Sequence, residues 1–200
     1  MLFCNIAENQ LNNDSAKFLS ESLFKNNTLL VLDISKNDIS GLGALCLCDM
    51  LKNNYTLQNL VFSTNPISDG GIIAIADGLK ENKGLKLLYV DDCEITDDAS
   101  GPIGEMLCIN SSLQYIFLNN NDLGDQLGVQ LTDVLNKNVA LISIELRNNK
   151  FTDIGVASIC KGLASNLVLK RLDVKNNFKI TSKGWHSLAK FKNIAESLPK

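Results

Sequence analysis

Residues 29–39 read LLVLDISKNDI, and this stretch decides the fold because its pattern returns along the whole chain. Its asparagine, Asn37, recurs at a step of 28 residues (65 − 37 = 28), together with apolar residues three and five positions before it. The recurring residues form a series that we call the asparagine ladder: Asn9, Asn37, Asn65, Cys93, Asn121, Asn149 and Asn177. A fixed period between about 20 and 50 residues is typical of a repeat protein.

Each repeat is predicted to contain one strand and one helix. Ahead of Asn37, the apolar residues Leu32 and Ile34 alternate with polar ones, which indicates a short strand with one buried face. Later in the unit, Leu47 and Leu51 stand four residues apart, which is helical spacing. The strand-and-turn segments are expected at about 1–11, 29–39, 57–67, 85–95, 113–123, 141–151 and 169–180.

Two further series recur in the repeat. Glycines near the expected helix starts, at Gly43, Gly71, Gly155 and Gly184, are expected to allow close approach of the neighbouring repeat. Asparagines follow the expected helices, and asparagine tolerates the left-handed conformation that ends a helix. We therefore predict C-terminal caps at Asn26, Asn54, Asn82, Asn110, Asn138 and Asn166.

The seven copies resemble the motif LxxLxLxxN(C)x(L/I/F) of the leucine-rich repeat family, and the 28-residue helical unit is similar to its ribonuclease-inhibitor-like subclass. Cys93 is a substitution that the family's motif allows. The resemblance implies an α/β fold, a horseshoe-shaped leucine-rich repeat solenoid of about seven strand–helix repeats. A parallel sheet is expected on the concave face and helices on the convex face, because strands stack about 4.7–4.9 Å apart whereas packed helices need about 8–10 Å. Residues 1–200 then form a single leucine-rich repeat domain.

Both ends of the chain depart from this pattern. Met1 occupies the first leucine position of a unit, so we expect either a truncated chain or part of a longer, multidomain one. After Asn177 the spacing slips by one residue. Apolar residues then recur at steps of three and four, which predicts a terminal capping helix over 181–198, since end repeats need an atypical cover.

The ladder asparagines are expected to have a structural role. They stand where the chain turns away from the strand, so their side chains can bond backbone groups that the parallel strands leave unpaired. A buried backbone group without a partner costs roughly 1–3 kcal/mol. Replacement of Asn121 by leucine is therefore predicted to destabilise the fold strongly.

The strand side chains that point away from the core form the available binding surface. Five of them in adjacent units are apolar, and contiguous exposed apolar surface with aromatic residues often marks a protein contact. Charged residues beside them are expected to form a rim. The predicted partner-binding residues are Val61, Leu87, Tyr89, Asp91, Asp92, Tyr115, Phe117, Asn119, Glu145, Arg147, Arg171 and Asp173. The alternative is that β-branched and aromatic residues simply suit a sheet surface.

The net charge of −3 conceals an uneven distribution. Residues 1–136 carry 7 Lys/Arg and 18 Asp/Glu (−11), whereas residues 137–200 carry 12 and 4 (+8). Either this is ordinary variation of a solvated surface, or an electrically polar rod orients a partner during encounter. Stacking aromatics do not accompany the basic residues, so no nucleic-acid partner is expected.

The six cysteines have no paired spacing, and no segment resembles a signal peptide or membrane span. We therefore predict a cytoplasmic protein without a membrane partner.

Residues that could carry chemistry are scattered. The single histidine, His186, follows Trp185 on the expected terminal helix, and Cys46 and Cys48 have neither zinc-ligand spacing nor a supporting second pair. An acidic group at Asp91, Asp92, Asp97 and Asp98 would suit acid–base or Ca²⁺ chemistry, but Asp97 and Asp98 open a helix whose dipole favours negative charge. We therefore predict no enzymatic activity, no cofactor and no metal site.

The resemblance to leucine-rich repeats implies a non-enzymatic protein–protein interaction module, a scaffold or regulatory domain that binds a protein partner on its concave face. One alternative is a GTPase-activating protein for a small GTPase, which has a similar fold. That activity needs a loop arginine in an early repeat, whereas the first arginine here is Arg147. A cytoskeletal or ciliary scaffold is the other alternative.

Overall fold

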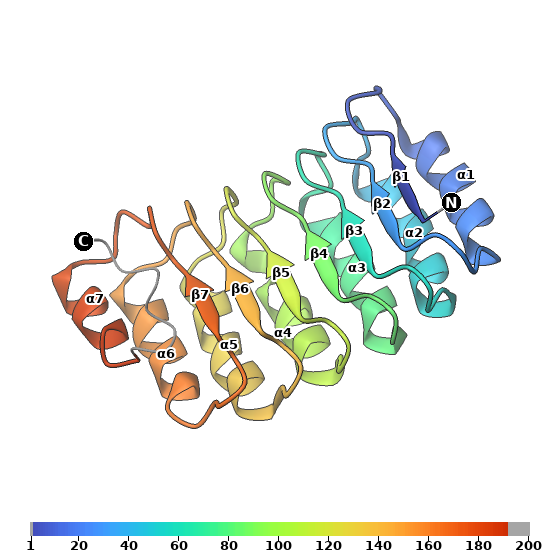
Figure 1. Ribbon diagram of the computed structural model, residues 1–200. Helices are drawn as coiled ribbons and strands as arrows, with labels where there is room; N and C mark the ends of the chain where they lie inside the picture. Colours follow the sequence, from blue (N-terminus) through green and yellow to red (C-terminus); the bar gives the residue numbers. More distant parts are fainter. Residues whose placement is uncertain (1, 192–200) are drawn as a thin grey trace.

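Seven strands alternate with seven α-helices in the computed structural model, which describes residues 2–191 (Figure 1). The strands are β1 Phe3–Asn5, β2 Val31–Asp33, β3 Asn59–Val61, β4 Leu87–Tyr89, β5 Tyr115–Phe117, β6 Ser143–Glu145 and β7 Arg171–Asp173. The helices are α1 Asn13–Phe24, α2 Gly41–Asn53, α3 Ser68–Glu81, α4 Ser100–Ile109, α5 Asp125–Lys137, α6 Asp153–Leu163 and α7 Ser182–Leu188. A short 3₁₀ helix, η1 Asp97–Ala99, precedes α4.

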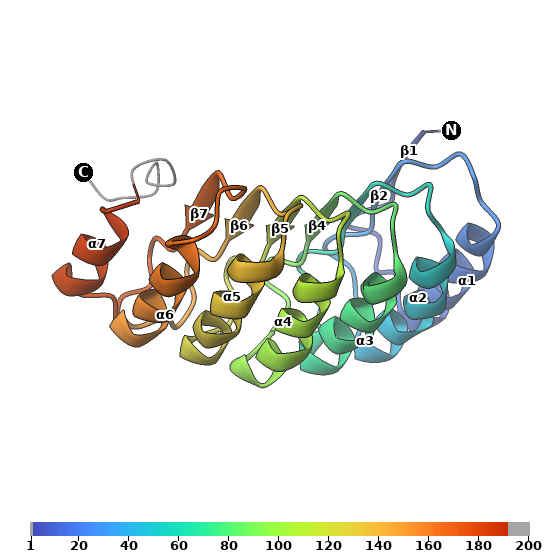
Figure 2. The ribbon, with the colours of Figure 1, turned by 90° about the horizontal axis from the view of Figure 1, so that it is seen from below.

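All seven strands form one parallel sheet in chain order, β1 to β7. Each residue pairs with the residue 28 positions later, as Val61 does with Tyr89 and Tyr89 with Phe117. The helices cover one face of the sheet, and the array bends so that the strands line its inner side (Figure 2). The predicted parallel-stranded solenoid is confirmed.

The core lies between the sheet and the helices and follows the predicted periodicity. From the second repeat onward, the paired strand residues such as Leu32 and Ile34 are fully or almost fully buried, as are helix residues such as Leu47 and Leu51. In the first repeat, Cys4 and Ile6 are only half-buried, because none of the described residues covers this end of the core as α7 covers the end at β7.

The residue before each ladder position has a left-handed backbone. Its φ lies between 53° and 60° in every unit, at Glu8, Lys36, Thr64, Asp92, Asn120, Asn148 and Asn176. Such a φ is uncommon for residues other than glycine and is least unfavourable for asparagine and aspartate. The N–H of this residue bonds the next repeat, as Asn120 N–H does to the carbonyl oxygen of Arg147 at 2.9 Å. Hydrogen bonds between repeats thus stabilise the strained left-handed turn that takes the chain out of the sheet.

The ladder asparagines bond backbone groups and, from Asn37 onward, connect consecutive repeats. The Asn121 Nδ2 group donates to the carbonyl oxygens of Val90, at 2.9 Å, and Leu118, at 3.1 Å. Its Oδ1 accepts the N–H groups of Cys93 and Ile95 at 3.0 and 3.1 Å. From Asn37 onward, each ladder asparagine binds backbone groups of its own repeat and of the one before it, whereas Asn9 donates to Ala7 within the first repeat.

Cys93 interrupts the ladder and changes the turn of the preceding repeat. The thiol has no amide oxygen to accept the N–H of Ile67, which donates to the Asn65 carbonyl oxygen at 2.8 Å instead. Ser68 then adopts a φ of 51° and donates its N–H to the Cys93 carbonyl oxygen. Burial raises the pKa of the Cys93 thiol to about 12, so the thiol is protonated at neutral pH.

The second asparagine series forms another ladder, at the far end of the helices. Asn54, Asn82, Asn110 and Asn138 do follow helices, but their φ values are negative and their backbones extended, so the predicted left-handed conformation is wrong. The Nδ2 group of Asn110 instead donates to the carbonyl oxygens of Leu79 and Asn82 in the preceding repeat. Its Oδ1 accepts N–H groups two and three residues later, which shapes the turn into the next strand.

A third ladder, which the sequence did not reveal, joins the helix starts. Asp125 at the beginning of α5 accepts the N–H and hydroxyl of Thr152 and the N–H of Gly155 in the next repeat. A Cβ atom at Gly155 would lie 2.4 Å from Asp125 Oδ1, which confirms that this glycine permits close approach. The equivalent residues, which we call the aspartate series, are Asn13, Asp69, Asp97, Asp125 and Asp153.

The C-terminal part of the described chain covers the last repeat. Leu188 of α7 is buried, and Trp185 and Phe191 pack against the core. Helix α7 ends at Leu188, so only part of the predicted capping helix over 181–198 is seen, and residues 192–198 lie outside the described residues.

Candidate functional site: the concave face

Three rows of side chains run across the concave face, because the strands are in register and every second residue points away from the core. The first row is Phe3, Val31, Asn59, Leu87, Tyr115, Ser143 and Arg171. The middle row is Asn5, Asp33, Val61, Tyr89, Phe117, Glu145 and Asp173. The third row lies just beyond the strands and is Ala7, Ser35, Ser63, Asp91, Asn119, Arg147 and Lys175.

The five apolar residues of β3 to β5 form a continuous patch, which we call the apolar shelf: Val61, Leu87, Tyr89, Tyr115 and Phe117. The rings of Tyr89 and Phe117 are stacked, with centroids 3.9 Å apart and planes inclined by 19°. All five side chains are half-buried, so the shelf is less exposed than the sequence suggested, because neighbouring strands let the side chains cover one another. Burial, followed by the charges of Asp91 and Glu145, raises the pKa of the Tyr89 hydroxyl.

Beside the shelf, β6 and β7 carry a compact charge network. Glu145 and Asp173 are adjacent in the middle row and are buried, with exposed fractions of 3% and 2%. The Nε of Arg171 donates to Glu145 Oε1, its Nη2 lies 3.4 Å from Glu145 Oε2, and Ser143 donates its hydroxyl to Glu145 at 2.9 Å. Arg171 Nη2 and Arg147 Nε lie 3.6 and 3.9 Å from Asp173 Oδ2.

The prediction of an exposed charged rim is wrong for Glu145 and Asp173, which are buried. Two like-charged carboxylates side by side repel each other, and both also lose hydration on burial. The two arginine side chains, each about half-exposed, compensate for this because Arg171 pairs with both carboxylates and Arg147 pairs with Asp173. Glu145 and Asp173 therefore hold the arginines in place, whereas the guanidinium groups form the accessible surface.

The predicted site residues Asp91 and Asn119 bind the neighbouring repeat. Asp91 Oδ1 accepts the N–H of Asn119 at 2.6 Å, and Asn119 Oδ1 accepts the N–H of Arg147 at 2.8 Å. Burial raises the pKa of the Asp91 carboxyl, and the hydrogen bonds from Asn119 oppose that rise. Asp92, the left-handed turn residue, is exposed.

Two hollows meet at Arg147 on this face. The first, which we call the shelf hollow, is bounded by Tyr115, Phe117, Asn119, Ile142, Ser143, Glu145, Arg147 and Arg171. The second, the amide hollow, is bounded by Asn119, Asn120, Arg147, Asn148 and Asn176. Ile142, Ser143, Asn120, Asn148 and Asn176 are absent from the predicted site. The last three share the turn position of Asp92, and this periodicity is the signal that could have identified them.

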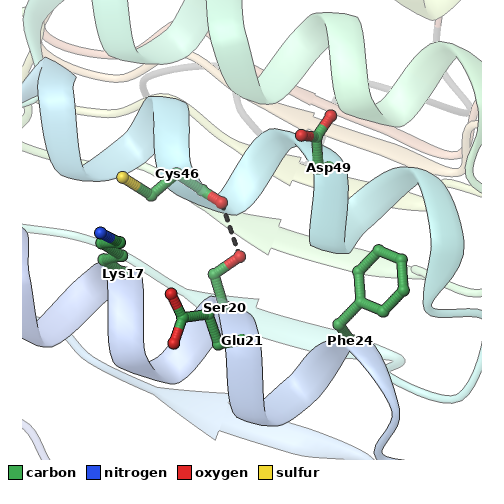
Figure 3. A pocket seen from close by; sticks show the side chains of 6 residues that line it. All are labelled: Lys17, Ser20, Glu21, Phe24, Cys46 and Asp49. Carbon is green, nitrogen blue, oxygen red and sulfur yellow. Dashed lines mark hydrogen bonds between the residues drawn. The ribbon is translucent and has the colours of Figure 1, made fainter.

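A further hollow lies on the helical side, between α1 and α2 (Figure 3). It is lined by Lys17, Ser20, Glu21, Phe24, Cys46 and Asp49. Ser20 donates its hydroxyl to the carbonyl oxygen of Cys46 at 2.6 Å, which ties the two helices together. None of the predicted site residues contributes to this hollow.

The acidic group around Asp91 does not act as a unit. Asp97 accepts the N–H groups of Gly124, Gln126 and Leu127, so its carboxylate caps helix α5 of the next repeat. In the part of the chain that the structure describes, no three His, Cys, Asp or Glu side chains are grouped so as to hold a metal ion. None of the helices within residues 2–191 has the length and apolar composition needed to span a bilayer.

The uneven charge of the sequence becomes a spatial separation. The two ends of the array are the two ends of the chain (Figure 1), so the acidic repeats β1 to β5 and the basic repeats β6 and β7 occupy different parts of the body. The shelf and the charge network lie next to each other where the sign changes.

Comparison with known proteins supports the class of fold. The family model described as leucine-rich repeat matches residues 25–48, 53–76 and 137–160. Together with the seven-stranded array, this match identifies the chain as a leucine-rich repeat solenoid. Its assignment to the ribonuclease-inhibitor-like subclass stays a prediction.

Two solved structures share the fold. One, of the actin-binding site 2 of leiomodin-1, has a TM-score of 0.55 and 24% sequence identity, and the match covers 58% of this chain and 69% of that one. Another, internalin C2 from Listeria monocytogenes, has a TM-score of 0.53 and 21% identity, with 96% of this chain and 77% of that one covered. A search of curated protein sequences gives no match.

Proposed function

We propose that this chain is a non-enzymatic protein-interaction module whose concave face binds a protein partner. The observation that carries the proposal is the apolar shelf, with its stacked Tyr89–Phe117 pair, lying directly beside the half-exposed side chains of Arg147 and Arg171. Aromatic and arginine side chains are the residues that contribute most to protein–protein affinity. A curved sheet presents them together to one partner surface. All six cysteines are free thiols, which favours a reducing compartment such as the cytoplasm.

The test is affinity capture with the 200-residue chain and two matched triple variants. The concave variant carries Tyr89→Ser, Tyr115→Ser and Phe117→Ser. The convex variant carries Leu45→Ser, Ile73→Ser and Val129→Ser, which alter three exposed apolar residues on helices α2, α3 and α5. We expect specific partners to be lost from the concave variant and retained by the convex one, with both variants folded by circular dichroism.

Retention of every partner by the folded concave variant, or loss only from the convex variant, would contradict concave-face binding. A GTP-hydrolysis assay with small GTPases addresses the first alternative, since acceleration would show an enzymatic role. The likeness to the actin-binding part of leiomodin-1 motivates an actin co-sedimentation assay, and recovery of actin or axonemal proteins would favour a cytoskeletal or ciliary scaffold.

A further inference from the structure

The two arginines of the charge network differ in what they are free to do. Arg171 is clamped by two nitrogen–oxygen contacts to Glu145 and a third to Asp173. Arg147 has one ion pair with the described residues, at the long distance of 3.9 Å from Asp173. Arg147 borders both the shelf hollow and the amide hollow. Arg147 therefore retains donors for an external group.

The charge balance at this end of the concave face indicates which external group fits. Arg147, Arg171 and Lys175 contribute +3, and Glu145 and Asp173 contribute −2, which leaves a formal charge of +1. Asparagine side chains, which are neutral, supply the rest of the amide hollow. A single carboxylate matches this balance, and an arginine fork matches carboxylate geometry. A phosphate, with a charge of about −1.5 to −2 at neutral pH, exceeds it.

The shelf hollow provides the second feature of the ligand. Tyr115, Phe117 and Ile142 supply an apolar wall that continues to Arg147, so an apolar side chain seated there places its neighbours near the guanidinium group. The third row lies two residues beyond the middle row along each strand, which is about 7 Å. An extended segment covers that distance in about two residues.

We propose that Arg147 is a specificity-determining residue for partners that present an apolar side chain and, about two residues away, an Asp or Glu carboxylate on an extended segment. The apolar side chain occupies the shelf hollow, and the carboxylate bonds Arg147 at the edge of the amide hollow. The asparagine amides beside Arg147 supply donors and acceptors for the backbone of the segment. This assignment rests on the proposed concave-face function and adds the chemical class of the ligand.

The probe is a displayed library of random linear peptides, selected on the immobilised 200-residue chain. Individual enriched peptides are then labelled, and their affinities are measured by fluorescence polarisation, each with its acidic residue intact and changed to the amide. The protein variants are Arg147→Met, Tyr115→Ser and a control, Lys150→Met. Lys150 belongs to the same repeat as Arg147 and carries the same charge, but it pairs with Asp122 and borders neither hollow.

We expect enriched peptides to combine the apolar and acidic residues at the stated spacing. Conversion of the acid to the amide should weaken binding about tenfold for the unmodified chain and for Lys150→Met, but only slightly for Arg147→Met. Tyr115→Ser should weaken both forms of the peptide alike.

Several outcomes would overturn the assignment. If peptides need Tyr115 but no acidic residue, concave-face binding is supported, and the proposal that the ligand presents a carboxylate to Arg147 is wrong. Peptides unaffected by both Tyr115→Ser and Arg147→Met would contradict concave-face binding as well. If phosphoserine in place of the acidic residue binds about tenfold more tightly, the group that Arg147 recognises is a phosphate and not a carboxylate. Enrichment of no peptide would exclude a linear segment as the ligand, whereas the affinity capture above tests a folded partner separately.

Discussion

A single side chain at position 121 shows how much of the fold depends on individual residues. Five backbone groups from two repeats lie within hydrogen-bonding distance of the Asn121 amide, and the residue is buried. No side chain without both a donor and an acceptor can replace these bonds. Cys93 shows the effect of a different residue at a ladder position, because the turn of the preceding repeat adopts a different conformation.

We predict that Asn121→Leu lowers the free energy of unfolding by at least about 3 kcal/mol, since each buried backbone group left unpaired costs about 1–3 kcal/mol. Urea denaturation followed by circular dichroism measures the change. The control is Asn9→Leu at the exposed end of the ladder, where the side-chain amide donates, among the described residues, only to the carbonyl oxygen of Ala7. That variant should change stability by less than about 0.5 kcal/mol. Equal effects at the two positions would contradict a structural role for the ladder.

At the scale of the element, most helix starts depend on the helix before them, although no side chain caps α3, where Gly41 occupies the equivalent position. The carboxylate of Asp125 caps α6 from outside, and it reaches the backbone because Gly155 has no side chain. The negative charge also lies at the positive end of the helix dipole. The aspartate series therefore joins neighbouring helix starts, while the ladder asparagines join the turns that follow neighbouring strands.

We predict that Gly155→Ala destabilises the protein by up to about 2 kcal/mol. A methyl group forced into a packed contact costs about 1–3 kcal/mol, and the helix propensity of alanine offsets about 1 kcal/mol of that cost. Gly70→Ala in α3 is the matched control, because a Cβ atom there meets nothing within 4 Å, and it should stabilise the protein slightly. The midpoints of urea denaturation report both changes. A stabilising Gly155→Ala would show that the helix spacing can relax.

At the scale of the whole molecule, the strands of the described repeats pair only with those of adjacent repeats. Strand β4 pairs with β3 and β5, whereas β1 pairs only with β2. In such arrays stability is a sum of repeat and interface contributions, so end repeats open more readily than central ones.

Two equivalent hydrogen bonds allow this to be tested. Ile6 N–H donates to Asp33 O and Val90 N–H donates to Phe117 O, both at 2.9 Å. We predict that in the 200-residue chain the Ile6 amide exchanges with solvent at least about tenfold faster than the Val90 amide, because the first repeat opens alone. Native-state hydrogen exchange measured by NMR gives both rates. Equal protection would mean that the array unfolds as one cooperative unit.

The concave face shows where prediction from sequence ends. The 28-residue register already placed Tyr89 beside Phe117 and Glu145 beside Asp173, so the apolar and charged parts of the candidate site could be located. It did not show that Tyr89 and Phe117 stack, or that Glu145 and Asp173 are buried beneath arginines. These features depend on side-chain conformation across strands, for which the repeat pattern carries no signal.

The sequence by itself determined the repeat length, the strand and helix of each unit, the buried residues and the ladder, because these follow from periodicity and from the burial of apolar side chains. Only the tertiary structure decided the extended asparagine caps, the aspartate series across helix starts, and the difference between the clamped Arg171 and the available Arg147. The physical reason is that these contacts join residues of different repeats, where competing hydrogen-bond and charge partners are selected by distance and burial.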